Sequence, residues 1–189
     1  MKGLCARLAV VLCALALLWP GSVAQAGTYS AAVFGGWHWG HKGGGFDTFK
    51  GGAEVEYRTR LAGLPLFELA LALPFSYYEA EPNIGGFRDV DVTTYSLIPT
   101  AKAYLTAIPA LHPYAGFGLG WARTDVGGPF NDTEDSLAVR VIVGAEYVLF
   151  PASPFLVFGE YEYTSIDLDE PIDADVGGDA VLFGVRLRF

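Results

Sequence analysis

The sequence is poor in cysteine. Only two of its 189 residues are cysteines, Cys5 and Cys13, and both lie among the first 26 residues. Residues 27–189 therefore have no thiol. This excludes a disulfide framework, a cysteine-based metal site and a cysteine nucleophile from that part of the chain.

Positive charge is also scarce. The chain has 12 Lys and Arg residues against 21 Asp and Glu residues, which gives a formal net charge of −9. A nucleic-acid-binding protein needs a basic face that displaces counterions from phosphates, and no basic run is present. A general nucleic-acid-binding function is therefore excluded.

The first 26 residues have the pattern of a Sec-type signal peptide. Lys2 and Arg7 form a positive head, residues 8–19 form an apolar stretch of 12, and the small residues Ala24 and Ala26 precede a cleavage site. An uncleaved anchor fits less well, because 12 apolar residues are too few to span a bilayer. We predict a signal peptide at 1–26 and one exported domain at 27–189, whose 10 basic and 21 acidic residues give it a charge of −11.

Beyond residue 26 there is no run of 18 apolar residues, so no membrane-spanning helix is expected. Apolar residues alternate with small or polar ones instead, as in the segments 67–77, 137–149 and 181–189. The 24 glycines and 27 aromatic residues (4 Trp, 10 Tyr and 13 Phe) also favour β structure. A period of two predicts strands with one apolar face.

The same test applied along the chain predicts eight strands of about ten residues or more, the length that crosses a membrane at a tilt. Their connections are alternately short and long, and the long ones are rich in Gly and Asp. This predicts an all-β fold, an eight-stranded antiparallel up-and-down transmembrane barrel with both chain ends in the periplasm. The predicted strands are Thr28–Trp39, Thr48–Arg60, Leu66–Tyr78, Val92–Leu105, Pro113–Arg123, Ser136–Phe150, Phe155–Ser165 and Asp179–Phe189.

A soluble barrel would also show alternation, but with its apolar face inward. Two features favour the membrane barrel. The apolar face has more bulky residues than an eight-stranded interior can hold. Aromatic residues also cluster near the strand ends, where the girdles of membrane barrels lie. These are Trp37, Trp39, Tyr77 and Trp121 toward the long loops, and Tyr29, Tyr57, Phe67, Tyr147, Phe155 and Phe189 toward the short turns.

Several short motifs resemble the small eight-stranded outer-membrane barrels, the OmpA-like and OmpX-like family. They are the stretches 113–120 (PYAGFGLG), 144–147 (GAEY) and 160–163 (EYEY), and the carboxyl-terminal Phe189 at the end of an alternating strand. The resemblance covers residues 27–189 and specifies architecture rather than activity. It implies that Phe189 is the signal read by the barrel assembly machinery. Pro74 and Pro99 depart from the pattern, so we expect bulges or strand ends there.

With the apolar face outward, the other face of the strands lines the lumen. Buried charge must be paired, so we predict salt bridges across the lumen, including Arg58–Glu68, Glu68–Lys102 and Glu160–Arg186. The inward glycines 116, 118 and 120 are expected to make room for long Arg and Glu side chains. The lumen network is predicted to contain Arg58, Glu68, Lys102, Arg140, Glu146, Glu160, Glu162, Arg186 and Arg188, together with Lys50, Glu54 and Glu56.

The other fifteen acidic residues lie in or beside the long loops. An acidic, solvated rim is the ordinary interpretation. The alternative is a site for Ca²⁺ or Mg²⁺ at Asp173, Asp175 and Asp179, since hard cations prefer oxygen ligands. No other cofactor and no other metal site is expected.

Three functions remain open. We favour a non-enzymatic outer-membrane barrel whose acidic loops act in cell-surface interaction or envelope stability. The first alternative is a narrow porin-like channel for ions or small solutes, and the second is a lipid A-modifying enzyme, although no catalytic residues can be named. The expected partners are outer-membrane lipid, lipopolysaccharide and the assembly machinery, and the protein is expected to be a monomer in the cell outer membrane.

Overall fold

The computed structural model describes residues 27–40, 47–61, 63–80, 91–127, 132–150, 153–166 and 177–189. The predicted signal peptide, residues 1–26, lies outside the described residues. So do Asp173 and Asp175 of the predicted cation site. The described part contains no helix that is long and apolar enough to cross a membrane.

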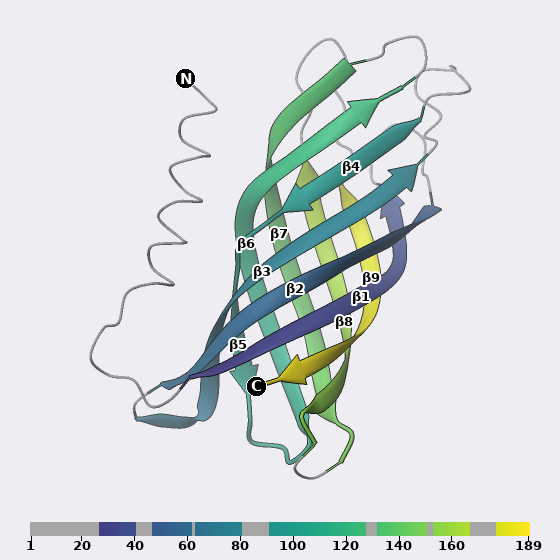
Figure 1. The fold of residues 1–189 in the computed structure, drawn as a ribbon. Coiled ribbons are helices and arrows are strands. Elements are labelled where there is room, and N and C mark those ends of the chain that lie inside the picture. The colour runs from purple at the N-terminus through teal and green to yellow at the C-terminus, as the bar shows by residue number, and fades with distance from the viewer. Residues whose placement is uncertain are drawn as a thin grey trace.

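Nine strands make up the regular structure of the described residues (Figure 1). Their bounds agree with the predicted strands to within about four residues at each end. The predicted fourth strand is divided in two. The strands are β1 (Thr28–Gly40), β2 (Asp47–Leu61), β3 (Leu64–Ala80), β4 (Val92–Leu97), β5 (Thr100–Leu105), β6 (Leu111–Val126), β7 (Asp132–Val148), β8 (Phe155–Ile166) and β9 (Gly178–Arg188).

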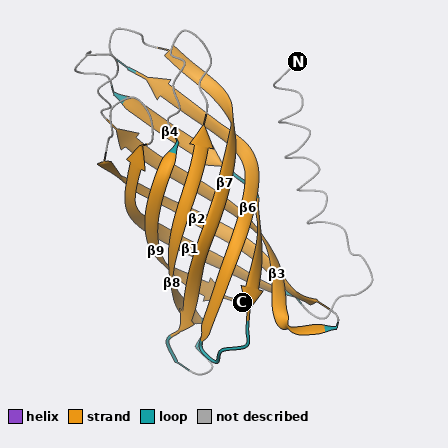
Figure 2. Cartoon of the chain, turned by 180° about the vertical axis from the view of Figure 1, so that it is seen from behind, coloured by secondary structure: helices purple, strands orange, loops and turns teal. Residues whose placement is uncertain are grey.

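The strands close into one antiparallel barrel (Figures 1 and 2). Strands that follow each other in the chain pair with each other, except β4 and β5, and β9 returns to pair with β1. The short strands β4 and β5 both lie between β3 and β6, so together they occupy one of the eight strand positions around the barrel. The predicted eight-stranded up-and-down barrel is confirmed.

Two prolines explain the division of the fourth stave. Pro99 lies between β4 and β5, and Pro74 lies opposite the gap in β3, which stays continuous. The backbone N–H of Ile98 donates to the Pro74 carbonyl at 3.4 Å, but Pro74 has no N–H to donate in return. The Thr100 hydroxyl donates to the Ile98 carbonyl instead, at 2.7 Å. The expected interruption is therefore present at Pro99, while Pro74 causes no break in its own strand.

The apolar face points outward, as predicted. Along β1 the odd-numbered side chains are exposed, with Val33 64% accessible, while the even-numbered Ala32 and His38 are buried. The same alternation runs along the other strands, and most of the exposed large side chains are apolar. The residues expected in aromatic girdles belong to this outer face, since Tyr29, Trp37 and Phe155 are all exposed near strand ends. A wall of this kind suits contact with lipid.

The inward glycines of β6 make room for residues different from those expected. A methyl group at Gly116 would meet the Ile142 side chain, one at Gly118 would meet Thr100, and one at Gly120 would meet Ile98. The atoms nearest these three glycines are backbone atoms and β-branched side chains of the neighbouring segments, not long Arg and Glu chains.

We predict that Gly120→Ala destabilises the barrel by about 1–3 kcal/mol, the usual cost of overpacking. An added methyl group would lie 2.3 Å from the Leu97 carbonyl oxygen and 2.5 Å from Cα of Ile98, and backbone atoms cannot move aside easily. The measurement is the urea midpoint of the gel-mobility shift between folded and unfolded protein. Gly159→Ala is the control, because its methyl group would only touch the Phe183 ring at 3.5 Å. Equal midpoints for the two variants would contradict this packing.

Candidate functional site

The lumen of the barrel collects twelve charged side chains at alternate positions of the strands. Six are acidic and six are basic, so the set is formally neutral. Arg186 and Glu146 are completely buried, and Glu68 and Arg188 at the short-turn end are the most accessible of the set. The twelve residues are Lys50, Glu54, Glu56, Arg58, Glu68, Lys102, Arg140, Glu146, Glu160, Glu162, Arg186 and Arg188.

Glu146 is the centre of the network at the short-turn end. Arg58 donates to both of its oxygens, from Nη1 to Oε1 at 2.6 Å and from Nη2 to Oε2 at 3.0 Å. Arg188 also donates to Glu146, and Nδ1 of His112 lies 3.2 Å from the same carboxylate. A bidentate arginine contact is the strongest form of this interaction. Glu146 thus holds strands β2, β6, β7 and β9 together.

Two carboxylates of β2 occupy the middle of the lumen. Lys102 donates to both oxygens of Glu54, at 2.7 and 2.9 Å. Arg186 donates to Glu54 at 2.8 Å and contacts Glu56 at 2.5 Å. The Tyr104 hydroxyl donates to the second oxygen of Glu56 at 2.7 Å. Each buried charge in this layer therefore has a partner of opposite charge.

A third group lies nearer the long-loop end. Arg140 donates to Glu160 from Nη2 and to Glu162 from Nε, both at 2.6 Å. Lys50 and the Thr164 hydroxyl both donate to the other oxygen of Glu162, Oε1. Arg140 is the bridge between the two carboxylates of β8.

The three groups form one continuous network. Arg58 donates to Glu56 at 2.7 Å and so joins the short-turn group to the middle group. Lys102 lies 3.9 Å from Glu160 and joins the middle group to the long-loop group. Ion pairs therefore run along most of the lumen without a gap.

Aromatic rings support the charged groups. The guanidinium of Arg58 lies 3.6 Å from the centroid of the Tyr104 ring, a cation–π contact. The Tyr104 and Tyr114 rings lie 4.8 Å apart, and the Tyr114 hydroxyl donates to Glu160 at 2.9 Å. These tyrosines were not among the residues predicted in the lumen. Both have even numbers like Lys102, and the phase of the alternation would have found them.

An apolar cluster fills the lumen on one side toward the long loops. This cluster was not predicted, because the inward face was expected to be polar. Its members are contributed by β4, β6, β7, β8 and the proline gap: Val92, Ile98, Ala122, Val126, Ala138 and Ile166. Beside it, the hollow between Lys50, Arg140 and Glu162 is too small to hold a water molecule. In this region the lumen is packed rather than open.

The individual pairs predicted across the lumen are only partly present. Arg58 and Glu68 lie 3.7 Å apart, but Glu68 also accepts a hydrogen bond from Arg60 at 3.0 Å. The predicted pairs assume that neighbouring strands mirror each other about their turn, and the observed register is displaced from that pairing along the strands. In the observed register Glu68 faces Tyr104 rather than Lys102, and Glu160 faces Leu182, four residues from Arg186. The predicted Glu68–Lys102 and Glu160–Arg186 pairs are therefore wrong.

The partners of those residues are set by reach as well as by register. Lys102 donates to Glu54, two strand positions away, and Glu160 binds Arg140 of the adjacent strand. Long side chains cross a narrow lumen, so a partner need not stand directly opposite.

The acidic rim is described only in part. Asp179 accepts a hydrogen bond from the Tyr161 hydroxyl. No group of three His, Cys, Asp or Glu residues that could hold a metal ion occurs within the described residues.

Phe189 is exposed at the barrel end, and its backbone exchanges hydrogen bonds with Tyr29, at 2.9 and 3.2 Å. Its role as an assembly signal stays a prediction.

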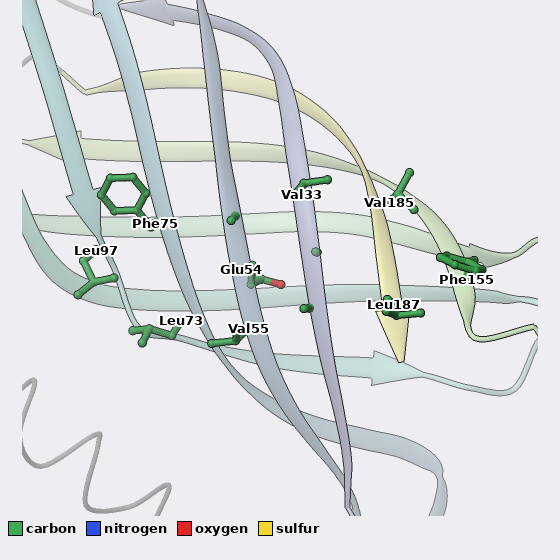
Figure 3. A pocket seen from close by; sticks show the side chains of 12 residues that line it. Val33, Glu54, Val55, Leu73, Phe75, Leu97, Phe155, Val185 and Leu187 are labelled. Atoms are coloured by element: carbon green, nitrogen blue, oxygen red, sulfur yellow. The ribbon is translucent and has the colours of Figure 1, made fainter. Parts of the chain in front are cut away.

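A shallow hollow of about 570 Å³ lies on the outer wall (Figure 3). The small residues Ala31 and Ala53 line it together with larger apolar side chains. Glu54 also lines it, but its carboxylate is engaged by Lys102 and Arg186. A hollow of this composition accommodates hydrocarbon rather than a polar ligand. The surrounding side chains are Val33, Val55, Leu73, Phe75, Leu97, Phe155, Val185 and Leu187.

The sequence matches the family described as outer membrane protein beta-barrel domain over residues 8–189, so the chain belongs to that family. This confirms the resemblance inferred from the short motifs. No curated protein matches the sequence significantly.

Solved structures share the fold. Neisserial surface protein A is 18% identical with a TM-score of 0.64, covering 86% of this chain and 97% of that one. Ail, the attachment invasion locus protein of Yersinia pestis, is 16% identical with a TM-score of 0.58, covering 86% and 98%. The outer membrane enzyme PagL is 15% identical with a TM-score of 0.52, covering 86% and 99%. At these identities the likeness concerns the fold alone.

We predict that Glu146→Gln destabilises the barrel by about 3–5 kcal/mol, because the buried Arg58 loses its bidentate partner and the partly buried Arg188 loses the carboxylate that it contacts. The urea midpoint of the gel-mobility shift measures the loss. Asp125→Asn is the matched control. Asp125 lies 3.6 Å from Arg123 with both side chains almost half exposed, so losing that pair should cost less than about 1 kcal/mol. Similar losses in the two variants would contradict a central role for Glu146.

Proposed function

We propose that this protein is a non-enzymatic outer-membrane barrel with a closed lumen, whose acidic loops act at the cell surface in interaction with other molecules or in envelope stability. In this proposal the short turns and the chain end at Phe189 face the periplasm. The protein works as a monomer, surrounded by phospholipid and lipopolysaccharide, after the barrel assembly machinery has read Phe189.

The closed lumen carries the proposal. Its charged side chains form ion pairs with each other. Glu146 accepts hydrogen bonds from Arg58 and Arg188, and Arg140 donates to Glu160 and Glu162. Conduction would require an aqueous path past these pairs. General acid–base catalysis would require a carboxylate that reaches a substrate. The network supports neither role as well as it supports a structural core.

A closed barrel leaves its surfaces as the place for function, and the long-loop end is strongly acidic. Fifteen of the 21 acidic residues lie in or beside the long loops, and only three basic residues, Lys42, Arg88 and Arg123, lie there with them. Such a surface repels polyanions and attracts cationic partners. The fold is shared with a Neisserial surface protein and with Ail, whose structure was determined with a heparin analogue. We expect the opposite charge preference here.

Divalent cations offer a second use of the acidic end. Asp173, Asp175 and Asp179 are the residues that we propose for Ca²⁺ or Mg²⁺, which would bridge the loops to lipopolysaccharide phosphates. This would contribute to envelope stability without a catalytic step.

We predict that the protein in vesicles binds a lysine-rich peptide but not heparin, and that binding weakens as salt is raised, because exposed charges are screened. Replacing Asp167, Asp169 and Glu170 by their amides together should reduce peptide binding severalfold, measured by titration of a fluorescent peptide. Glu68→Gln, at the opposite end of the barrel, is the control and should leave binding unchanged. Heparin binding, or equal peptide binding by both variants, would contradict the proposal.

A further inference from the structure

The tip of the hairpin between β2 and β3 is an unusual feature of the short-turn end. Residues 61–67, with the sequence LAGLPLF, contain no charged or hydrogen-bonding side chain. In both views of the barrel the first residues of β3 run sideways from the wall, at the end where the chain terminates (Figures 1 and 2). An apolar segment here needs a physical reason.

The local backbone explains why the tip projects. Gly63 has a φ of +85°, which suits glycine in a tight turn, and Leu61 pairs with Leu64 across it. The register then shifts, so that Arg60 pairs with Glu68 and residues 65–67 have no direct partner in β2. Such a bulge bends its strand away from the regular ladder.

The tip is fastened to the barrel at its base. The Leu66 carbonyl accepts a hydrogen bond from the Thr106 backbone N–H at 2.9 Å, and Phe67 pairs with Leu105 of β5. The direction of the tip is therefore fixed by contacts with β2 on one side and with β5 and Thr106 on the other.

The apolar side chains of the tip are open to the surroundings. Leu64 and Leu66 are each 51% accessible and Phe67 is 42% accessible. Phe67 has the same parity along β3 as Leu69, which belongs to the exposed apolar wall. An exposed apolar surface of this kind marks a contact with a membrane or a partner, and here Phe67 joins the tip to the outer face that suits lipid.

A basic residue, Arg60, lies next to the tip at the end of the regular β2–β3 pairing. Arg60 is 65% accessible, and its contact with Glu68 uses Nε at 3.0 Å. The exposed end of the guanidinium therefore has Nη groups available to donate to an anion. An arginine beside an apolar segment is the arrangement expected where a protein meets lipid headgroups.

We propose that this hairpin tip inserts into the leaflet that surrounds the short-turn end, with Leu64, Leu66 and Phe67 among the acyl chains and Arg60 on a phospholipid phosphate. The tip then acts as a lateral anchor that fixes the depth and tilt of the barrel. This inference rests on the proposed membrane insertion of the barrel. A second copy of the chain and a periplasmic protein are the competing occupants.

The test measures the depth of a spin label at position 66. In the full chain, with Cys5 and Cys13 replaced by serine, Leu66→Cys is labelled with a nitroxide and the protein is inserted into phosphatidylethanolamine–phosphatidylglycerol vesicles. Relaxation by lipid-soluble oxygen is compared with relaxation by a water-soluble nickel chelate. We expect oxygen to dominate at position 66 as strongly as at the wall position Val33→Cys, and nickel to dominate at Ser153→Cys in the β7–β8 turn.

The outcomes separate this inference from the proposed function. Nickel access at position 66 with oxygen access at position 33 would overturn the anchor while leaving the membrane barrel intact. Nickel access at both positions would overturn membrane insertion itself, and the anchor with it. Dipolar broadening between labels at position 66 would indicate a second copy and would also overturn the proposal. In the Arg60→Ala background we expect a loss of oxygen contact at position 66, whereas Arg123→Ala at the far end leaves it unchanged.

Discussion

Charge inside a closed barrel must be paired, and the rest of this structure follows from that requirement. An unpaired buried ion costs several kcal/mol, so the completely buried Arg186 and Glu146 are tolerated only because each has partners of opposite charge. The six acids and six bases of the lumen balance each other. With the polar side chains turned inward, the bulky apolar ones face outward, where lipid is the compatible surrounding.

Most of the fold could be predicted from the sequence, because the alternation of apolar with small or polar residues is a local pattern that can be recognised in each strand separately. The break at Pro99 was equally local. The partners inside the lumen could not be predicted, since they depend on the strand register and on the length of the side chains. Glu160 binds Arg140 rather than Arg186, because β8 and β9 are displaced by four residues from the pairing that places Glu160 opposite Arg186. The apolar cluster around Ile98 was missed because the inward face was assumed to be polar throughout.

The closed lumen that we propose moves the question of function to the surfaces. The three surfaces differ in chemistry: an acidic long-loop end, an apolar wall with one hollow beside Ala31 and Ala53, and an apolar hairpin tip beside Arg60. The surroundings that we propose for them are cationic partners, acyl chains, and, for the hairpin tip, acyl chains with a phospholipid phosphate at Arg60. The barrel core serves to hold these surfaces at fixed positions relative to the membrane.

The most direct test of a sealed lumen is the conductance of the purified protein in a planar lipid bilayer. If the ion pairs from Glu146 to Glu162 close the barrel, the current stays at the level of the bare bilayer across a range of voltages. Stable single-channel steps that are lost or altered in Glu160→Ala or Arg186→Ala would contradict this account, because they would show ions passing through the network.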